Sequence, residues 1–168
     1  MSRVELAEDF RQSSNPVEVL EEIIHANDWP FERHGDGELT IEIAGHWCTY
    51  HLYFVWQPLA NAFFFSCHFD IRVPEGKREE VYQLVTRANE RLWMGHFDFL
   101  SDDMTIVFRH THSTLGLREC AVELFEEVIE TAITECERFY PALHLLLWGG
   151  QSAEEALQVS FMETLGEA

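Results

Sequence analysis

The sequence predicts an α+β fold, in which helices pack on an antiparallel five-stranded sheet in the order α-β-β-β-α-β-β-α, followed by a short C-terminal helix. Three observations predict it. Apolar residues change from helical spacing to strict alternation after residue 30 and return to helical spacing near residue 77. The alternating segments build one strongly hydrophobic face, which needs helices to cover it. No repeat, low-complexity segment or linker interrupts the 168 residues, and this favours a single domain.

The chain opens with a polar, weakly patterned stretch. We expect residues 1–14 to form a flexible arm and residues 15–168 to form the domain. Asn15 followed by Pro16 is typical of a helix start, because the asparagine can cap the helix and proline is favoured at its first position. The predicted helix Pro16–Ala26 carries four apolar side chains on one face, namely Val17, Leu20, Ile23 and Ile24.

Three strands are predicted next, over Glu38–Ile43, Trp47–Trp56 and Ala62–Ile71. In a hairpin both apolar sets must lie on one face, so the numbers of directly opposed residues must add up to an odd value. This rule allows a register in which the opposed pairs are Ile43 with Cys48, Trp56 with Asn61, Phe54 with Phe63, Tyr50 with Cys67, and Thr49 with His68.

A second helix is predicted over Lys77–Leu92, with Val81, Leu84, Val85 and Ala88 facing inward and Gly95 as its stop. A second hairpin follows, in which Phe97 and Phe99 pair with Met104 and Ile106 across Ser101–Asp103.

The last long helix is predicted to start near Leu117 and to be kinked or ended by Pro141. Its buried stripe is expected to hold Leu117, Ala121, Leu124, Phe125, Val128, Ala132, Cys136 and Phe139. Ser152 and Glu155 have the spacing of a capping box, which predicts the short terminal helix.

The formal net charge of −19 excludes whole classes of partner. Nucleic acids and anionic membranes require clustered Lys and Arg, and the 11 basic residues here are scattered. The acidity is expected to serve solubility, or to steer the protein towards basic partner surfaces. The glutamates of the last helix are expected to form a solvated face or a surface for such a partner.

The four cysteines, Cys48, Cys67, Cys120 and Cys136, show no metal-binding spacing and fall on apolar faces, as buried free thiols of a reducing compartment do. No signal peptide and no apolar run of membrane-spanning length occurs, so we expect a cytoplasmic protein.

Nine histidines raise the question of a metal. The polar side of the sheet would hold His51, His68, Asp70, His96 and Asp98, but a metal needs three or four converging ligands, and a single hairpin brings at most two together. His110-Thr-His112 and the lone Glu22-x-x-His25 lack the additional ligands that metal enzymes require. We therefore expect neither a metal nor another cofactor. The common signatures of hydrolases, proteases and nucleotide-binding enzymes are absent, and we expect no enzymatic activity.

Apolar residues also lie on the side of the sheet that faces away from the main core. Tyr53, Val55, Phe64 and Val107 share this side and need a cover, which the second helix or the twofold partner of a homodimer could supply. Trp93 is counted with this association surface. As tryptophans beside glycines, Trp93 and Trp148 are nevertheless expected to anchor the core rather than to serve as ligand platforms.

The segments Asn89–Phe97, Val107–His110 and Glu137–Pro141, together with the tail from Trp148 to Leu157, resemble the YbjN family of bacterial sensory transduction regulators. The resemblance covers nearly the whole chain from Asn15 onward. The family is similar in fold to class I type III secretion chaperones, which are acidic homodimers that hold a partner protein in extended form, and the acidity and length of this chain agree with that comparison. The resemblance carries no catalytic residues to this chain, and kinship of fold does not by itself transfer a function.

Taken together, the sequence predicts a non-enzymatic protein-binding module, chaperone-like or regulatory, that acts as a homodimer and binds a further protein. The alternative is a sensor domain that binds a small ligand or a metal on the polar sheet face.

Overall fold

The computed structural model describes residues 15–115 and 121–165. The predicted arm of residues 1–14 therefore lies outside the described residues, as do Leu117 and Cys120. The elements in chain order are α2 (Pro16–Ala26), β1 (Phe31–Arg33), β2 (Glu38–Ala44), β3 (Thr49–Gln57), the short helix η1 (Pro58–Ala60), β4 (Ala62–Arg72), the short helix η2 (Glu75–Lys77), α3 (Arg78–Asn89), β5 (His96–Leu100), β6 (Thr105–Ser113), α4 (Ala121–Trp148) and α5 (Ala153–Leu165).

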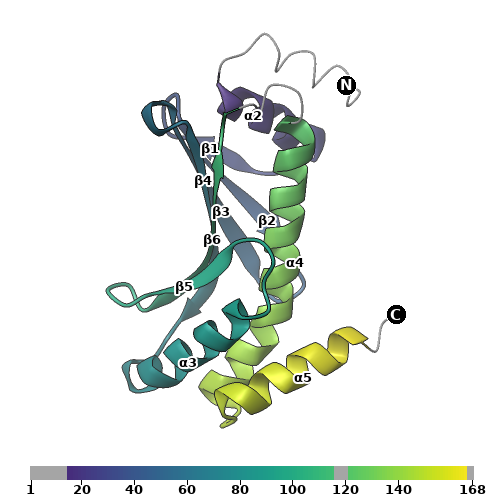
Figure 1. Ribbon diagram of the computed structural model, residues 1–168. Coiled ribbons are helices and arrows are strands. Elements are labelled where there is room, and N and C mark those ends of the chain that lie inside the picture. The colour runs from purple at the N-terminus through teal and green to yellow at the C-terminus, as the bar shows by residue number, and fades with distance from the viewer. Residues whose placement is uncertain (1–14, 116–120, 166–168) are drawn as a thin grey trace.

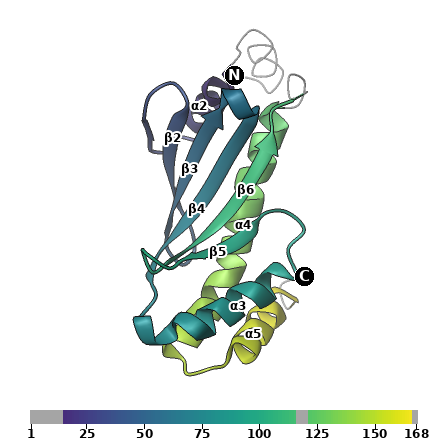
Figure 2. The same ribbon diagram turned by 60° about the vertical axis from the view of Figure 1, so that its left-hand side comes forward.

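The strands form one open antiparallel sheet in the order β1-β2-β3-β4-β6-β5, and the helices pack on one of its faces (Figures 1 and 2). The helix α4 runs along the sheet, α2 lies near its upper end, and α3 and α5 gather around its lower half (Figure 1). The predicted α+β fold with one antiparallel layer is thus confirmed. Phe65, Phe99 and Ile106 all lie in the core between this layer and the helices.

The sheet has six strands rather than the predicted five. The additional strand, β1, pairs with β2 so that Phe31 lies opposite Ile41. It was missed because three residues are too few to show alternation, and because Trp29-Pro30 marks the end of α2 but gives no signal for a strand directly after it.

The parity rule predicted the correct face of every strand but the wrong register in all three hairpins. The observed pairs are Ile43 with Tyr50, Phe54 with Phe65, His51 with His68, and Phe99 with Ile106. The observed loops are residues 45–48, 58–61 and 101–104, each one residue later than the four residues that the predicted pairs enclose. Asn61 and Met104 adopt φ values of 47° and 55°, which belong in turns and not at the start of a strand.

Both ends of the helical layer follow local capping rules. The side chain of Asn15 accepts a hydrogen bond of 3.0 Å from the backbone N–H of Val17, which starts α2 as predicted. At the other end, the Ser152 hydroxyl and the Glu155 carboxylate exchange hydrogen bonds with each other's backbone N–H, and this confirms the capping box of α5.

The helix α4 does not end at Pro141, which was one of the two predicted effects of this proline. Proline removes one N–H from the helix, but the buried Phe139, Ala142 and Leu143 on either side hold the following turns against the core. The helix continues to Trp148. On its predicted stripe Leu124 is only half-buried, whereas Val122 and Ile129, which were not predicted, are buried.

The helix α3 buries Val81, Leu84, Val85 and Ala88 as predicted, but it packs against β5, α4 and α5. The expectation that it covers part of the second sheet face is therefore not met.

Cys67 and Cys136 are buried free thiols whose sulfur atoms lie 3.6 Å apart between β4 and α4. Burial raises the pKa of the Cys136 thiol well above its ordinary value, and the hydrogen bond to Cys67 adds to this effect. Cys48 is half-buried.

Candidate functional site

The face of the sheet opposite the helices is the most distinctive surface of the described chain. We call it the open face and define it by the outward side chains of β2 to β6, because no described helix packs on it (Figure 2). The predicted residues Tyr53, Val55 and Phe64 lie here, with Val55 directly opposite Phe64. The side chain of Tyr53 is 43% exposed, while Val55 and Phe64 are half-buried.

A row of mostly titratable residues crosses the open face beside these apolar residues. In order along neighbouring strands, the row consists of Glu42, His51, His68, the apolar Val107 and Asp98. His51 Nδ1 is 3.6 Å from the Glu42 carboxylate. The structure thus brings His51 opposite His68, a pair that the predicted register kept apart.

His68 is held by its neighbours in the sheet. Its ring packs edge-on to Tyr53 at 4.7 Å and lies 3.1 Å from the Ser66 hydroxyl. Burial lowers the pKa of His68, and the nearby His51 and Arg109 lower it further. The imidazole is therefore neutral near pH 7, and it forms part of a packed surface rather than a charged one.

Arg109 links the apolar and polar parts of the open face. Its guanidinium donates to the Asp98 carboxylate at 2.8 Å and lies over the Phe64 ring at 5.2 Å from the ring centre. This arrangement combines an ion pair with a cation–π contact, and it covers part of the aromatic surface.

Two predicted surface residues are placed differently. Val107 lies on the open face between His68 and Asp98 but is only 1% exposed, so it offers almost no surface to a partner. Trp93 lies in the connection between α3 and β5 and is fully exposed. Trp148 is 56% exposed at the end of α4, so the expectation that these two tryptophans anchor the core is wrong.

Within the described residues, no group of three or more His, Cys, Asp or Glu side chains is arranged to hold a metal ion. The ring centres of His110 and His112 are 6.1 Å apart, and no described His, Cys, Asp or Glu side chain completes a metal site with them. That the chain works without a metal or cofactor stays a prediction.

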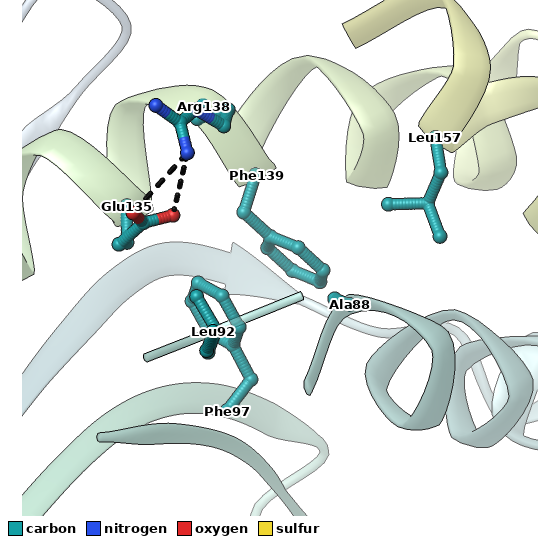
Figure 3. Close-up of a pocket in the computed structure, with 7 residues that line it drawn as sticks. All are labelled: Ala88, Leu92, Phe97, Glu135, Arg138, Phe139 and Leu157. Carbon is teal, nitrogen blue, oxygen red and sulfur yellow. Dashed lines mark hydrogen bonds and ion pairs between the residues drawn. The ribbon is translucent and has the colours of Figure 1, made fainter. Parts of the chain in front are cut away.

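A small hollow lies where α3, α4, α5 and β5 meet (Figure 3). Phe97 and Phe139 stack here at 4.2 Å, and an ion pair between Glu135 and Arg138 lies beside them. Its volume of about 10 Å³ is that of a single water molecule, so this hollow is a packing junction and not a ligand site.

A second surface escaped sequence reasoning. An open groove of about 410 Å³ lies beside α4 and α5, and its rim includes Trp47, stacked on Tyr140 with ring centres 6.0 Å apart. The sequence pattern assigns Trp47 to a strand, whereas it lies in the β2–β3 turn, where its ring is 46% exposed. It was missed because Trp47 directly precedes the alternating residues of the strand and was counted with them.

No helix in the described part of the chain has the length and apolar character needed to cross a membrane.

Comparison with known proteins decides the family. The sequence profile of the YbjN family, described as "putative bacterial sensory transduction regulator", matches residues 16–145. This is most of the chain. The chain belongs to the YbjN family.

The fold of this YbjN-family protein is similar to the crystal structure of YbjN from E. coli, which is described as "a putative transcription regulator". The TM-score is 0.53 at 10% sequence identity, and the similarity covers 73% of this chain and 87% of the E. coli chain. At this identity the likeness concerns the fold alone. A search of curated proteins found no match. The family description is that of a regulator and not of an enzyme, and the similarity to secretion chaperones stays a prediction.

Proposed function

We propose that this YbjN-family protein is a non-enzymatic protein-binding module, regulatory or chaperone-like, that forms a homodimer through its open face. The observation that carries the proposal is that this face exposes Tyr53 beside Val55 and Phe64, with no described helix over them. A twofold partner covers such a surface by presenting the same residues in return, and closed twofold dimers are the most frequent assemblies of soluble proteins.

The charge pattern supports a protein partner in addition to the second copy. The outer side of α4 exposes Glu123, Glu127 and Glu130, and the whole chain carries −19. A field of one sign raises the association rate of oppositely charged partners. We further propose that the protein acts in the cytoplasm. The juxtaposed thiols of Cys67 and Cys136 support this, because such a pair stays reduced there.

The experiment compares two tyrosines that are matched in exposure. Tyr53 on the open face and Tyr82 on α3 are 43% and 42% exposed, and each makes one edge-on ring contact, with His68 and Phe99 respectively. Light scattering is expected to give a dimer for the wild type and for Tyr82→Glu, but a monomer for Tyr53→Glu, because two buried carboxylates would face each other across the twofold axis. A wild type that remains monomeric, or a Tyr53→Glu protein that stays dimeric, would contradict the proposal.

A further inference from the structure

Among the described residues, the two edge strands and the last residues of β6 each have one side without a partner strand, and they differ in how this side is protected. The edge strand β1 is three residues long. The edge strand β5 is capped by Asn89 of α3, whose side-chain amide donates to the Phe97 carbonyl at 2.9 Å and accepts from the Phe97 N–H at 2.7 Å. Short and capped edges are the usual protection against unwanted strand pairing.

The third stretch, His110–Ser113 of β6, has no such protection among the described residues. It pairs with β4 on one side, while β5 pairs with β6 no further than Arg109. In Figure 2 this half of β6 lies at the margin of the sheet. The described chain therefore leaves four residues of a long strand open to one side.

The hydrogen-bonding direction of these residues follows from their neighbours. Asn89 bonds the backbone N–H and C=O of Phe97, so these two groups point away from β6. Backbone groups alternate in direction along a strand, so the even-numbered residues of β5 bond to β6. Their partners on β6 are Thr105, Val107 and Arg109. The backbone groups of the even-numbered residues of β6 therefore point to β4. The residues that flank β6 agree with this direction, because the Val73 N–H donates to Met104 O and the Thr114 N–H donates to Asn61 O, each at 2.7 Å.

By the same alternation, the backbone N–H and C=O of Thr111 and Ser113 point to the unpaired side. Four polar backbone groups are thus presented in the spacing of a strand, and the complementary chemistry is the main chain of another extended segment.

The side chains at this edge indicate the charge of that segment. β6 has no carboxylate, and neither does the facing stretch Ala62–Cys67 of β4. His110 and His112 lie half-buried on the helix side of the sheet. Burial lowers the pKa of His110, and the neighbouring His112 and His96 lower it further, so a nearby negative charge would favour the protonated form of His110.

We propose that His110–Ser113 of β6 accepts an extended acidic segment of a partner polypeptide as an added strand, with carboxylates beside His110 and His112. This inference deepens the protein-binding function proposed above and rests on it, but it uses a different surface from the open-face dimer. A second copy of the chain fits this edge less well. Pairing β6 with its own twofold mate would join only four residues per chain, and a second His110–Ser113 stretch would bring no carboxylate to the two histidines.

The probe is the heptapeptide Thr-Glu-Val-Glu-Val-Glu-Thr with blocked ends, titrated into the full chain near pH 6 and followed by NMR. A salt concentration of about 0.15 M screens the long-range field of the −19 chain, so that the contacts at the strand edge decide the binding. We expect binding with a Kd of about 1 mM or tighter, with shifts centred on Thr111 and Ser113. The same peptide with lysine in place of glutamate is expected to bind at least about tenfold more weakly. No shift at about 5 mM peptide, or equal binding of the lysine peptide, would overturn the proposal.

Two N-methylated peptides test backbone pairing, one methylated on its valines and the other on its central glutamates. Only alternate N–H groups of an added strand face its neighbour, so one of these peptides must lose binding and the other must keep it. If both lose it or both keep it, the peptide does not bind as a strand.

On the protein side, Thr111→Pro removes the outward N–H and leaves the bonds to β4, as proline at a sheet edge allows. It is expected to weaken peptide binding at least about tenfold, whereas the dimer variant Tyr53→Glu keeps it, so failure of the dimer and failure of the edge site are distinguishable. Hydrogen exchange of the wild type gives a readout that needs no variant, with Thr111 and Ser113 exchanging faster than His110 and His112. Slow exchange at Thr111, or a wild-type dimer that Thr111→Pro dissociates, would overturn the assignment.

Discussion

The cap on β5 gives a prediction whose size follows from the structure. Asn89→Ala removes two hydrogen bonds, of 2.7 and 2.9 Å, from the backbone of Phe97, a residue that is only 3% exposed. Each buried group left without a partner costs about 1–3 kcal/mol, and water at the edge of the sheet favours the lower half of that range. Alanine is the better helix former by about 0.6 kcal/mol. The net loss is therefore about 2 kcal/mol.

Urea unfolding followed by circular dichroism measures this loss. The matched control is Thr86→Ala on the same helix, because the exposed Thr86 hydroxyl bonds only to Tyr82 O of its own helix, and its removal is expected to change stability by less than about 0.5 kcal/mol. Asn89→Asp keeps the acceptor for the Phe97 N–H but loses the donor, and should fall between the two. A loss below about 0.5 kcal/mol for Asn89→Ala would refute the assignment of Asn89 as the edge cap.

Two further perturbations test the packing and the electrostatics. Gly95→Ala should destabilise the fold by about 2–4 kcal/mol, because Gly95 has φ +69° and an added Cβ would clash with the Phe108 ring, whereas Gly76→Ala meets no neighbouring atom and should be neutral in thermal unfolding. Burial, followed by the neighbouring His51, lowers the pKa of His68 below its ordinary value of 6.5, so the unfolded chain takes up this proton at higher pH than the folded one. Above pH 6.5 His68 is neutral in both states, and as the pH falls below this value its protonation lowers the free energy of unfolding. The variant His68→Asn should therefore flatten this part of the stability–pH curve. An unchanged curve would contradict the assignment.

Much of the fold was predictable because its signals are local. The cap at Asn15 and the box at Ser152 depend on residues a few positions away, and the alternation of apolar residues fixes which side of each strand meets the helices. Register was not predictable from alternation, because shifting a hairpin by two residues preserves every face. In two of the three turns the observed register places Asn61 and Met104 in left-handed backbone, a requirement that the apolar pattern does not report.

The candidate site was predictable only in part. Tyr53 and Phe64 were assigned to the open face from their parity alone, and the structure places them there. The edge of β5 that Asn89 caps and the uncapped edge of β6 exist because β6 lies between β4 and β5. The local pattern of a strand does not show which strands will be its neighbours, so these edges were not predictable. Trp93 was misjudged because an apolar ring beside a glycine suggests a core position, whereas the connection that carries it lies on the surface.

A second copy of the chain that covers the open face must protect Tyr53 from solvent, and selective chemical labelling tests this without any mutation. In an isolated chain Tyr53 and Tyr82, 43% and 42% exposed, should react equally with a tyrosine-specific reagent, with mass spectrometry as the readout. In the native protein Tyr53 is expected to be protected while Tyr82 reacts, and this protection is expected to disappear on dilution below the dissociation constant of the dimer. Equal labelling of the two tyrosines at every protein concentration would contradict it.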